Sequence, residues 1–478
     1  MLRLRLVPFS SFCGSSSSLG TGETIDMAKT VDRGLENREI VLDVLMEVLE
    51  KGAFIHQVLG QALYKYQYLD KSDRAFITRA AEGTLDYLIQ IDYIIEKYSS
   101  VKIRKMKPLI RTLLRMSAYQ ILYMDRVPDA AVCNEAVELA AKRRFAGLKG
   151  FVNGVLRSIS REKAAFASDA AFDSPSLRYS IPQWIYDQWE AEYGRERAET
   201  VCASFLKERS LWVRCNLSRA SADEILASLR AQQAEAEPLP GMEYMLALSG
   251  VNRLEDLDAF REGLIQVQDA SSALVGEIAA PRPGDYVIDV CAAPGGKSLH
   301  LADRLNGTGT VEARDLTPQK IEMIEENIAR CRMPGVRAVL QDALAYDPDS
   351  REKADIVLAD LPCSGLGIMG RKPDIKYHMT PEKMRELAAL QREILSVVWQ
   401  YVKPGGLLLY STCTIDRLEN EENVRWFVEN FPFEPVDLSN RLPAGIAGGV
   451  SRQKGCLQLL PGAGPFDGFF ISLLKRQE

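Results

Sequence analysis

Apolar residues between positions 39 and 160 recur three and four residues apart, the spacing that places them on one face of a helix. Pro108 suits the first turn of one of these helices, because a residue at that position has no helical N–H bond to lose. The pattern is clearest in the first helix, where it runs through Ile40, Val41, Val44, Leu45, Val48 and Leu49. The stretch therefore predicts an all-helical bundle.

The composition changes near residues 161–175, where alanine and serine accumulate before Pro175 and indicate a linker. Beyond the linker the patterns are mixed. Residues 211–216 are a candidate strand, and Ser221 with Glu224 has the spacing of a capping box at the start of a helix. Shorter strand patterns follow around residues 244–248 and 264–267. Together they predict a small α+β module.

After Pro283 the chain alternates between strand and helix patterns. The pattern predicts strands at 286–290, 310–311, 336–340, 355–360 and 406–410, and helices at 296–305, 318–330 and 381–402. Such alternation is typical of a largely parallel, doubly wound sheet, whose ligands bind beyond the carboxyl ends of its strands. We therefore expect a Rossmann-like α/β domain here.

The predicted fold class is multidomain, and a length of 478 residues is typical of about three domains. We expect the helical bundle at 27–162, the α+β module at 175–270 and the Rossmann-like domain at 271–478. Residues 1–26 are excluded from the fold. Their arginines, their serine run and their shortage of acidic residues resemble a disordered targeting segment, whereas the helical patterns that follow favour a true start at Met27.

Composition excludes several classes of protein. No apolar run approaches the roughly 20 residues that cross a bilayer, so a membrane protein is not expected. Nine cysteines without a C-x-x-C spacing, and only three histidines, argue against a metal site and against a secreted disulfide framework. We therefore predict free thiols and a reducing, cytoplasmic location. The absence of a sustained heptad or repeat favours a monomer.

The net charge of −6 gives no overall attraction for nucleic acid, so any RNA-binding surface must be local. Basic residues do gather in one region of the predicted bundle. They are Lys102, Arg104, Lys105, Lys107, Arg111, Arg115, Lys142, Arg143, Arg144, Lys149 and Arg157. This region is a candidate RNA surface, and the alternative is that these charges simply solvate the outer faces of helices.

A glycine-rich turn follows the first strand of the predicted Rossmann-like domain. Gly295 and Gly296 allow a ligand to approach the backbone at the start of a helix, which favours the negative end of a bound group. Asp315 follows the second strand, where a carboxylate can accept ribose hydroxyls, and Asp342 follows the third, where it can accept an adenine amino group. Since no G-x-G-x-x-G is present, adenosylmethionine fits better than a nicotinamide dinucleotide.

Two cysteines follow strand patterns of the same domain. Cys363 comes after residues 355–360 and Cys413 after residues 406–410, so both thiols are expected at one edge of the sheet. Carbon 5 of a pyrimidine is a weak nucleophile, but a thiolate that adds to carbon 6 makes it enamine-like. A second thiol can then help to remove the proton from carbon 5. A buried structural role is the alternative for any cysteine, and we assign it to Cys133, Cys202, Cys215, Cys331 and Cys456.

Several phrases in these segments resemble, in order, the motifs of the RNA cytosine-5 methyltransferases of the Sun/Nop2 superfamily. They are Asp289-Val-Cys-Ala-Ala-Pro-Gly-Gly-Lys297, Asp360-Leu-Pro-Cys-Ser-Gly-Leu-Gly367, Arg371-Lys-Pro-Asp374, Ser411-Thr-Cys413 and Asp467-Gly-Phe-Phe470. The bundle is similar to the RNA-binding module of the antitermination factor NusB, through Glu135-Ala-Val and Phe151-Val-Asn-Gly-Val-Leu-Arg157. Leu361 and Phe466 depart from the usual motifs without removing a reactive group.

The resemblance implies roles for particular residues. Cys413 would attack carbon 6 and Cys363 would assist release of the methylated RNA, while Asp360 and Lys297 would hold the target cytosine. It also implies an adenosylmethionine pocket lined by Cys291, Ala292, Ala293, Pro294, Gly295, Gly296, Lys297, Asp315, Asp342 and Asp360.

The expected activity is methylation of carbon 5 of a cytidine in 16S ribosomal RNA, and the RNA is the expected partner. Two alternatives remain open at this point. One is a transfer RNA cytosine-5 methyltransferase. The other is a noncatalytic RNA-binding or antitermination protein, against which the intact cysteine motifs argue.

Overall fold

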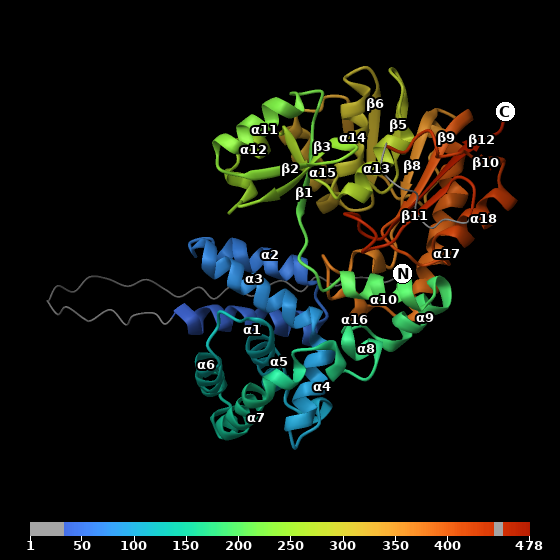
Figure 1. The fold of residues 1–478 in the computed structure, drawn as a ribbon. Coiled ribbons are helices and arrows are strands. Elements are labelled where there is room, and N and C mark those ends of the chain that lie inside the picture. Colours follow the sequence, from blue (N-terminus) through green and yellow to red (C-terminus); the bar gives the residue numbers. More distant parts are fainter. Residues whose placement is uncertain (1–32, 444–452) are drawn as a thin grey trace, which may run out of the picture.

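The computed structural model describes residues 33–443 and 453–478. The prediction for residues 1–26 lies outside these ranges. Figure 1 shows the helical bundle on one side of the molecule and two sheets on the other, with the helices α9 (Gln183–Tyr193) and α10 (Arg195–Ser204) beside the short α16 (Ile375–His378). The multidomain fold class predicted above is confirmed, whereas the domain boundaries stay predictions.

Most helices of the bundle bury one apolar stripe, as their spacing predicted, whereas the helix that starts at Pro108 is buried nearly all round. Pro108 occupies the first turn of its helix, and the helix that starts at Lys71 is capped by Asp70, whose side chain accepts the N–H of Asp73. The helices are α1 (Arg33–Lys51), α2 (Ile55–Lys65), α3 (Lys71–Asp86), α4 (Leu88–Tyr98), α5 (Pro108–Tyr123), α6 (Asp129–Lys142) and α7 (Lys149–Glu162). Their buried residues form one continuous core.

A small antiparallel sheet follows α8 (Pro175–Arg178), α9 and α10. Its strand order is β2-β3-β1-β4, with β1 (Leu211–Cys215), β2 (Glu235–Leu239), β3 (Met242–Ser249) and β4 (Ile265–Val267). The predicted capping box of Ser221 and Glu224 starts α11 (Ala222–Ala231). Strand β2 was not predicted, because its sequence Glu-Ala-Glu-Pro-Leu is largely exposed and contains a proline.

The second sheet carries the predicted Rossmann-like pattern, with strand order β10-β12-β9-β8-β5-β6-β7 and β11 paired to β12. Its parallel strands are β5 (Tyr286–Asp289), β6 (Thr310–Asp315), β7 (Val336–Leu340), β8 (Ala354–Asp360) and β9 (Val402–Thr412). The antiparallel strands β10 (Phe433–Pro435), β11 (Cys456–Leu459) and β12 (Phe469–Arg476) were not predicted. The sheet is therefore mixed.

Helices cover both faces of this sheet, which explains the apolar runs in β5 and β8. Val287 packs into the core on one face and its neighbour Ile288 into the core on the other, since successive residues of a strand point to opposite sides. One face carries α13 (Ala270–Ala279), α14 (Gly296–Leu305) and α15 (Pro318–Cys331), and the other carries α17 (Pro381–Val398) and α18 (Glu421–Asn430).

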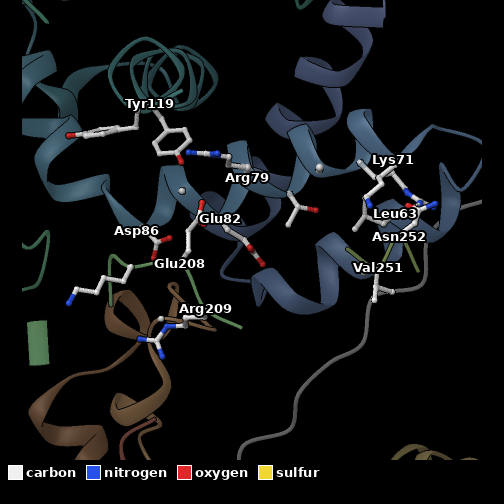
Figure 2. Close-up of a pocket in the computed structure, with 18 of the residues that line it drawn as sticks. Leu63, Lys71, Arg79, Glu82, Asp86, Tyr119, Glu208, Arg209, Val251 and Asn252 are labelled. Carbon is white, nitrogen blue, oxygen red and sulfur yellow. Dashed lines mark hydrogen bonds between the residues drawn. The ribbon is translucent and has the colours of Figure 1, made fainter. Parts of the chain in front are cut away.

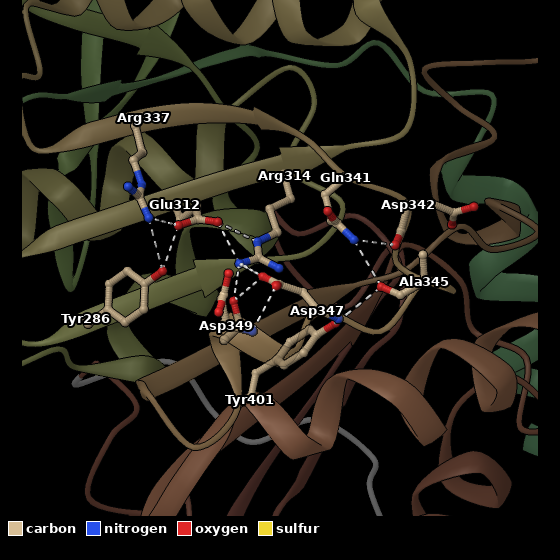
Figure 3. Close-up of polar contacts among 11 residues, drawn as sticks. Tyr286, Glu312, Arg314, Arg337, Gln341, Asp342, Ala345, Asp347, Asp349 and Tyr401 are labelled. Atoms are coloured by element: carbon tan, nitrogen blue, oxygen red, sulfur yellow. Dashed lines mark hydrogen bonds and ion pairs between the residues drawn. The ribbon is translucent and has the colours of Figure 1, made fainter.

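Charged side chains are also buried on β6, where they are paired. Arg314 donates to Glu312 over 2.7 Å and forms an ion pair with Asp347 at 3.2 Å. Figure 3 shows Tyr286 and Arg337 completing the partners of Glu312. Removing one partner of such a network leaves a buried charge uncompensated, so we infer that the network fixes the position of β6 and of the residues at its end.

The bundle contacts the Rossmann-like domain through the segment that contains the Arg371–Asp374 motif. The Ile55 N–H donates to the Asp374 carboxylate over 3.0 Å, and Lys376 donates to the backbone carbonyls of Asp86 and Ser180 over 2.8 Å and 2.7 Å. Tyr377 donates to the carbonyl of Leu85 over 2.7 Å. One continuous segment thus joins the bundle to the loop that carries Cys363.

Candidate active site

The two cysteines predicted at one sheet edge meet there. Strands β8 and β9 are parallel neighbours in which Asp360 lies opposite Ser411, so the loops after them leave the sheet side by side. These loops place the Cys363 and Cys413 sulfurs 3.3 Å apart. That separation is longer than the roughly 2.05 Å of a disulfide bond, and both cysteines are free and partly exposed.

Their surroundings give the two thiols opposite tendencies to ionise. The hydrogen bond from the Cys363 thiol, together with Lys297 and Lys372 nearby, lowers the pKa of Cys413 although burial opposes this. The same hydrogen bond, burial and the nearby Glu419 carboxylate raise the pKa of Cys363 well above its usual value. Asp360 raises the pKa of Cys413 whereas Lys297 and Lys372 lower it, and the balance favours the negative charge on Cys413 and the proton on Cys363.

Lys297 and Asp360 form an ion pair beside Cys413. The Lys297 ammonium lies 2.7 Å from one Asp360 oxygen, and Ser411 donates to the other oxygen over 2.7 Å. The Phe469 ring lies 5.3 Å from the same ammonium. Burial lowers the pKa of Lys297, but the attraction of Asp360 outweighs it and the pKa is raised overall. Since the two side chains are 17% and 25% exposed, both are accessible to a ligand.

The glycine-rich turn leads from β5 into α14. Gly295 has φ +99°, which favours glycine, and caps the helix that starts at Gly296. The turn is anchored to β6, because the Ala292 N–H donates to the Arg314 carbonyl over 2.8 Å and the Ala293 N–H to the Asp315 carboxylate over 2.9 Å. The first helical N–H groups have no partner within a helix and can bind a ligand.

The other predicted cofactor residues differ in burial and in their hydrogen-bond partners. Asp315 is buried and accepts from Lys320 over 2.9 Å as well as from Ala293, whereas Asp342 is exposed and accepts the N–H of Leu344 over 2.9 Å. Figure 3 shows Asp342 beside Gln341 in the turn after β7. Burial raises the pKa of Cys291, which makes it a poor nucleophile.

The residues present fit adenosylmethionine. A Cβ added to Gly296 meets no atom within 4 Å, so the backbone there is open to a ligand. Carboxylates stand at the ends of β6 and β8 and in the turn after β7, and such groups accept hydrogen bonds from hydroxyl and amino groups. Adenosylmethionine presents such groups on its ribose, its adenine and its methionine portion.

The motifs contain other residues to which the sequence analysis assigned no role, and the structure joins them to each other and to Arg209 and Asp269. Gly468 donates its N–H to the Gly367 carbonyl over 2.9 Å, and Gly367 donates to the Cys413 carbonyl over 3.1 Å, so three motifs meet through their backbones. Asp467 pairs with both Arg371 and Arg209, and Arg371 also lies 2.7 Å from Asp269. These contacts join residues far apart in the chain, which no local pattern indicates.

A cavity of about 1190 Å³ lies away from the thiols, between the bundle and the segments 205–209 and 251–255. Figure 2 shows Lys71, Arg79 and Arg209 around it, together with Glu82, Asp86 and Tyr119. Gly370, next to Arg371, also lines it. The cavity thus adjoins the segment that joins the bundle to the catalytic loop.

Two further findings concern the described residues only. Within 33–443 and 453–478 no helix is long and apolar enough to cross a membrane. In the same part of the chain, no group of three or more histidine, cysteine, aspartate or glutamate side chains is arranged to hold a metal ion.

The chain matches three family models. Residues 277–475 match the 16S rRNA methyltransferase RsmB/F family, residues 35–161 the NusB family, and residues 181–254 the RsmF/B-like ferredoxin-like domain. The fold and the site therefore define an adenosylmethionine-dependent methyltransferase with a NusB-like helical domain.

Curated relatives match nearly the whole chain. A protein of Bacillus subtilis named probable ribosomal RNA small subunit methyltransferase B is 37% identical, with 92% of this chain and 98% of the relative covered. A Synechocystis protein of the same name is 32% identical, with 92% and 99% covered. The crystal structure of PH0851 superimposes with a TM-score of 0.78 at 25% identity and covers 93% of this chain and 98% of its own. The chain belongs to the ribosomal RNA small subunit methyltransferase B family.

Proposed function

We propose that the protein methylates carbon 5 of a cytidine in 16S ribosomal RNA through a covalent bond between Cys413 and carbon 6. The observation that carries the proposal is the pair of free thiols with sulfurs 3.3 Å apart beside the Lys297–Asp360 ion pair. The names of the Bacillus and Synechocystis relatives, both small-subunit ribosomal RNA methyltransferases, support the choice of RNA.

Cys413 acts as the nucleophile. Its lowered pKa favours the thiolate, and the addition of that thiolate to carbon 6 makes carbon 5 electron-rich enough to accept a methyl group. Asp360 and Lys297 hold the polar edge of the cytosine, which must leave its base stack to reach them. Adenosylmethionine, when bound, supplies the methyl group.

Cys363 assists release. Once carbon 5 carries both a methyl group and a proton, the proton must leave so that the carbon 5–carbon 6 double bond can form again. Cys363 can take it once its own proton has been removed, because its sulfur lies 3.3 Å from that of Cys413. The electron pair of the broken bond between sulfur and carbon 6 returns to Cys413.

The adenosylmethionine pocket in this proposal is formed at the ends of β5 to β8. The backbone of the turn from Cys291 to Lys297 contacts the cofactor, and carboxylates accept its hydroxyl and amino groups. The proposed set is Cys291, Ala292, Ala293, Pro294, Gly295, Gly296, Lys297, Asp315, Asp342 and Asp360.

Two features of the described structure support an extended RNA contact. Arg104, Lys105 and Lys107 are exposed on the bundle, and the interdomain cavity is lined by the exposed side chains of Lys71 and Tyr64. Cations neutralise phosphates and aromatic rings stack on unpaired bases. The bundle and the cavity are therefore the proposed surfaces for the RNA around the target cytidine.

The test is a bisulfite map of 5-methylcytosine in ribosomal and transfer RNA from cells that lack this protein, restored with wild type or with Cys413→Ala. We expect one cytosine of 16S ribosomal RNA to lose its mark and to regain it only with wild type. Cys456→Ala is the matched control, because Cys456 lies on β11 outside the site and should restore the mark fully.

Other outcomes would change the proposal. Loss of a mark from transfer RNA instead would identify transfer RNA as the substrate. Unchanged maps would favour a noncatalytic RNA-binding protein. Restoration by Cys413→Ala would overturn the role of the nucleophile. The cytoplasmic location and the monomeric state stay predictions, and light scattering of the purified protein measures the second.

A further inference from the structure

A buried carboxyl group, that of Glu419, lies in the loop between β9 and α18. Its side chain is fully buried, and one oxygen accepts both the Ser364 N–H and the Gln391 amide over 2.9 Å. The other oxygen makes no hydrogen bond within the part of the chain that the structure describes. Burial raises the pKa of Glu419 to about 7, against the hydrogen bonds from Ser364 that lower it. Glu419 therefore has proton-accepting capacity that its present contacts do not use.

Glu419 and Gln391 together hold the chain on both sides of Cys363. Gln391 also donates to the Pro362 carbonyl over 2.9 Å, so the residue before Cys363 and the residue after it are bound to the same buried pair. Gln391 is itself fixed, because its carbonyl oxygen accepts from Tyr410 over 3.1 Å and from Asn423 over 2.7 Å. The backbone of Cys363 is thus clamped from the inside of the domain.

The clamp also connects the two cysteine loops. Ser364 and Thr414 share a hydrogen bond of 2.8 Å between their hydroxyl groups, and each is the residue directly after one of the two cysteines. Glu419 belongs to the same loop as Cys413, yet it binds the loop of Cys363. The separation of the sulfurs is therefore set by this buried group of polar contacts.

The electrostatic environment assigns the proton of the pair. Lys297 and Lys372 favour the thiolate of Cys413, whereas the Glu419 carboxylate disfavours a negative charge on Cys363. These charges favour the proton on Cys363 and the negative charge on Cys413. When Cys413 bonds to carbon 6 its negative charge is lost, and the Cys363 proton no longer has that sulfur as its acceptor.

We propose that Glu419 is a positioning residue for Cys363, which holds that thiol beside Cys413 and takes its proton once Cys413 is bonded to carbon 6. The inference rests on the proposed function, in which Cys363 assists release. The inference extends that function by naming the group that accepts the Cys363 proton.

The proton transfers balance. The S–H bond of Cys363 breaks and an O–H bond forms on Glu419, which leaves a Cys363 thiolate. That thiolate takes the proton from carbon 5, and the electron pair of the broken C–H bond forms the double bond between carbons 5 and 6. The bond between carbon 6 and Cys413 breaks, and its electron pair returns to that sulfur. Both cysteines regain their starting states, and the proton on Glu419 later passes to solvent.

The test is a single-turnover reaction of the full-length protein with adenosylmethionine and 16S ribosomal RNA transcribed in vitro, stopped in hot detergent. Two rates are measured: formation of the protein–RNA adduct and its decay to free methylated RNA. In Glu419→Gln the amide oxygen can still accept from Ser364 and Gln391, but the proton acceptor is gone. We expect decay to slow by about 100-fold, the scale of general base catalysis, while adduct formation changes by less than about 2-fold.

Two further variants separate this role from a structural one. Glu419→Asp keeps the carboxylate and should restore part of the decay rate, which a purely structural role would not predict for a shorter side chain. Glu429→Gln, an exposed carboxyl at the end of the same α18, should decay as wild type. Melting temperature and adenosylmethionine binding of each variant show whether it is folded.

The outcomes distinguish this inference from the proposed function. Decay at the wild-type rate in Glu419→Gln, or an equal loss of adduct formation and decay in folded protein, overturns the role of Glu419. Cys363→Ala is run beside it: if that variant also accumulates no adduct, the proposed release step itself has failed. If Cys363→Ala accumulates adduct and Glu419→Gln does not, the inference about Glu419 alone is wrong.

Discussion

The edge of the large sheet and the interdomain cavity both contain half-buried acidic residues, but the two regions treat them differently. At the sheet edge Asp360 lies 2.7 Å from the Lys297 ammonium and also accepts from Ser411. In the cavity Glu82 and Asp86 form no ion pair within the described residues, and burial raises the pKa of each to about 7. The two regions therefore differ mainly in whether a cation contacts the acidic group, and less in how deeply that group is buried.

The catalytic end of the sheet stabilises negative charge. Lys297 lies beside both Asp360 and Cys413, and the pKa of Cys413 is lowered. The cavity keeps its carboxyls near the midpoint of titration at neutral pH, so its net charge changes over a physiological range.

The largest effect is expected from Lys297→Met, which removes the cation and nearly keeps the volume. Asp360 would lose its ion partner and Cys413 one of the two cations that lower its pKa, so we expect single-turnover methylation to fall by about 100-fold to 1000-fold. The rate at which iodoacetamide alkylates Cys413, followed against pH, should show the thiol pKa moving upward.

The matched control is Lys403→Met, because Lys403 forms an ion pair with Asp355 near the opposite end of the same sheet. That variant should keep both the methylation rate and the alkylation profile. An unchanged profile in Lys297→Met would mean that Lys297 does not stabilise the thiolate, and the contrast between the two regions would then lose its electrostatic basis.

A smaller effect is expected from Gly468→Ala. The added Cβ would lie 2.6 Å from the Gly367 Cα and 2.7 Å from an Ile415 methyl group, and the first neighbour is backbone that must shift. We expect the catalytic domain to lose about 2 kcal/mol of stability, the usual cost of overpacking, and methylation to slow because the Gly367 loop holds the Cys413 carbonyl.

Gly464→Ala is the control for this substitution, since its Cβ would have Phe466 as its nearest neighbour at an ordinary 3.8 Å. Differential scanning calorimetry compares the unfolding transitions of the two variants. Equal transitions would show that the contact between Gly367 and Gly468 yields easily, and that the sheet edge is less tightly fixed than its hydrogen bonds indicate.

The parts of the fold that were predictable are those coded by local periodicity. Strands buried on both faces are continuous apolar runs, and the polar residue that ends each run marks the sheet edge. Asp360, Cys363 and Cys413 follow such runs, and the structure brings them together with Lys297. Their roles as nucleophile, release group and substrate contacts came from the family resemblance and stay proposals.

The parts that were missed depend on contacts between distant segments. β12 pairs with β9 only after the chain returns to the sheet, and neither the Glu419–Gln391 clamp nor the Gly367–Gly468 contact has a local sequence signal. The role proposed for Glu419 depends on its burial beneath α17. Its sequence neighbours do not indicate this burial, and in an exposed loop the same residue would be an ordinary surface charge.

The smallest effect is expected in the cavity, from Glu82→Gln. The pKa of Glu82 is raised from 4.5 to about 7, so folding favours the protonated form, and wild type loses stability as pH rises from about 4.5 to about 7. Glutamine cannot ionise. At pH 8 the variant should therefore be more stable than wild type by about 1 to 2 kcal/mol, after allowance for partial exposure, and at pH 4.5 the difference should vanish.

Urea unfolding of the two proteins at both pH values measures this difference, with Glu138→Gln on the exposed side of α6 as the control that should show none. A gain that is equal at pH 4.5 and pH 8 would trace to packing rather than ionisation. A loss at pH 8 would mean that the Glu82 carboxylate is stabilised after all, and the cavity would then resemble the sheet edge in holding its acidic group as a paired charge.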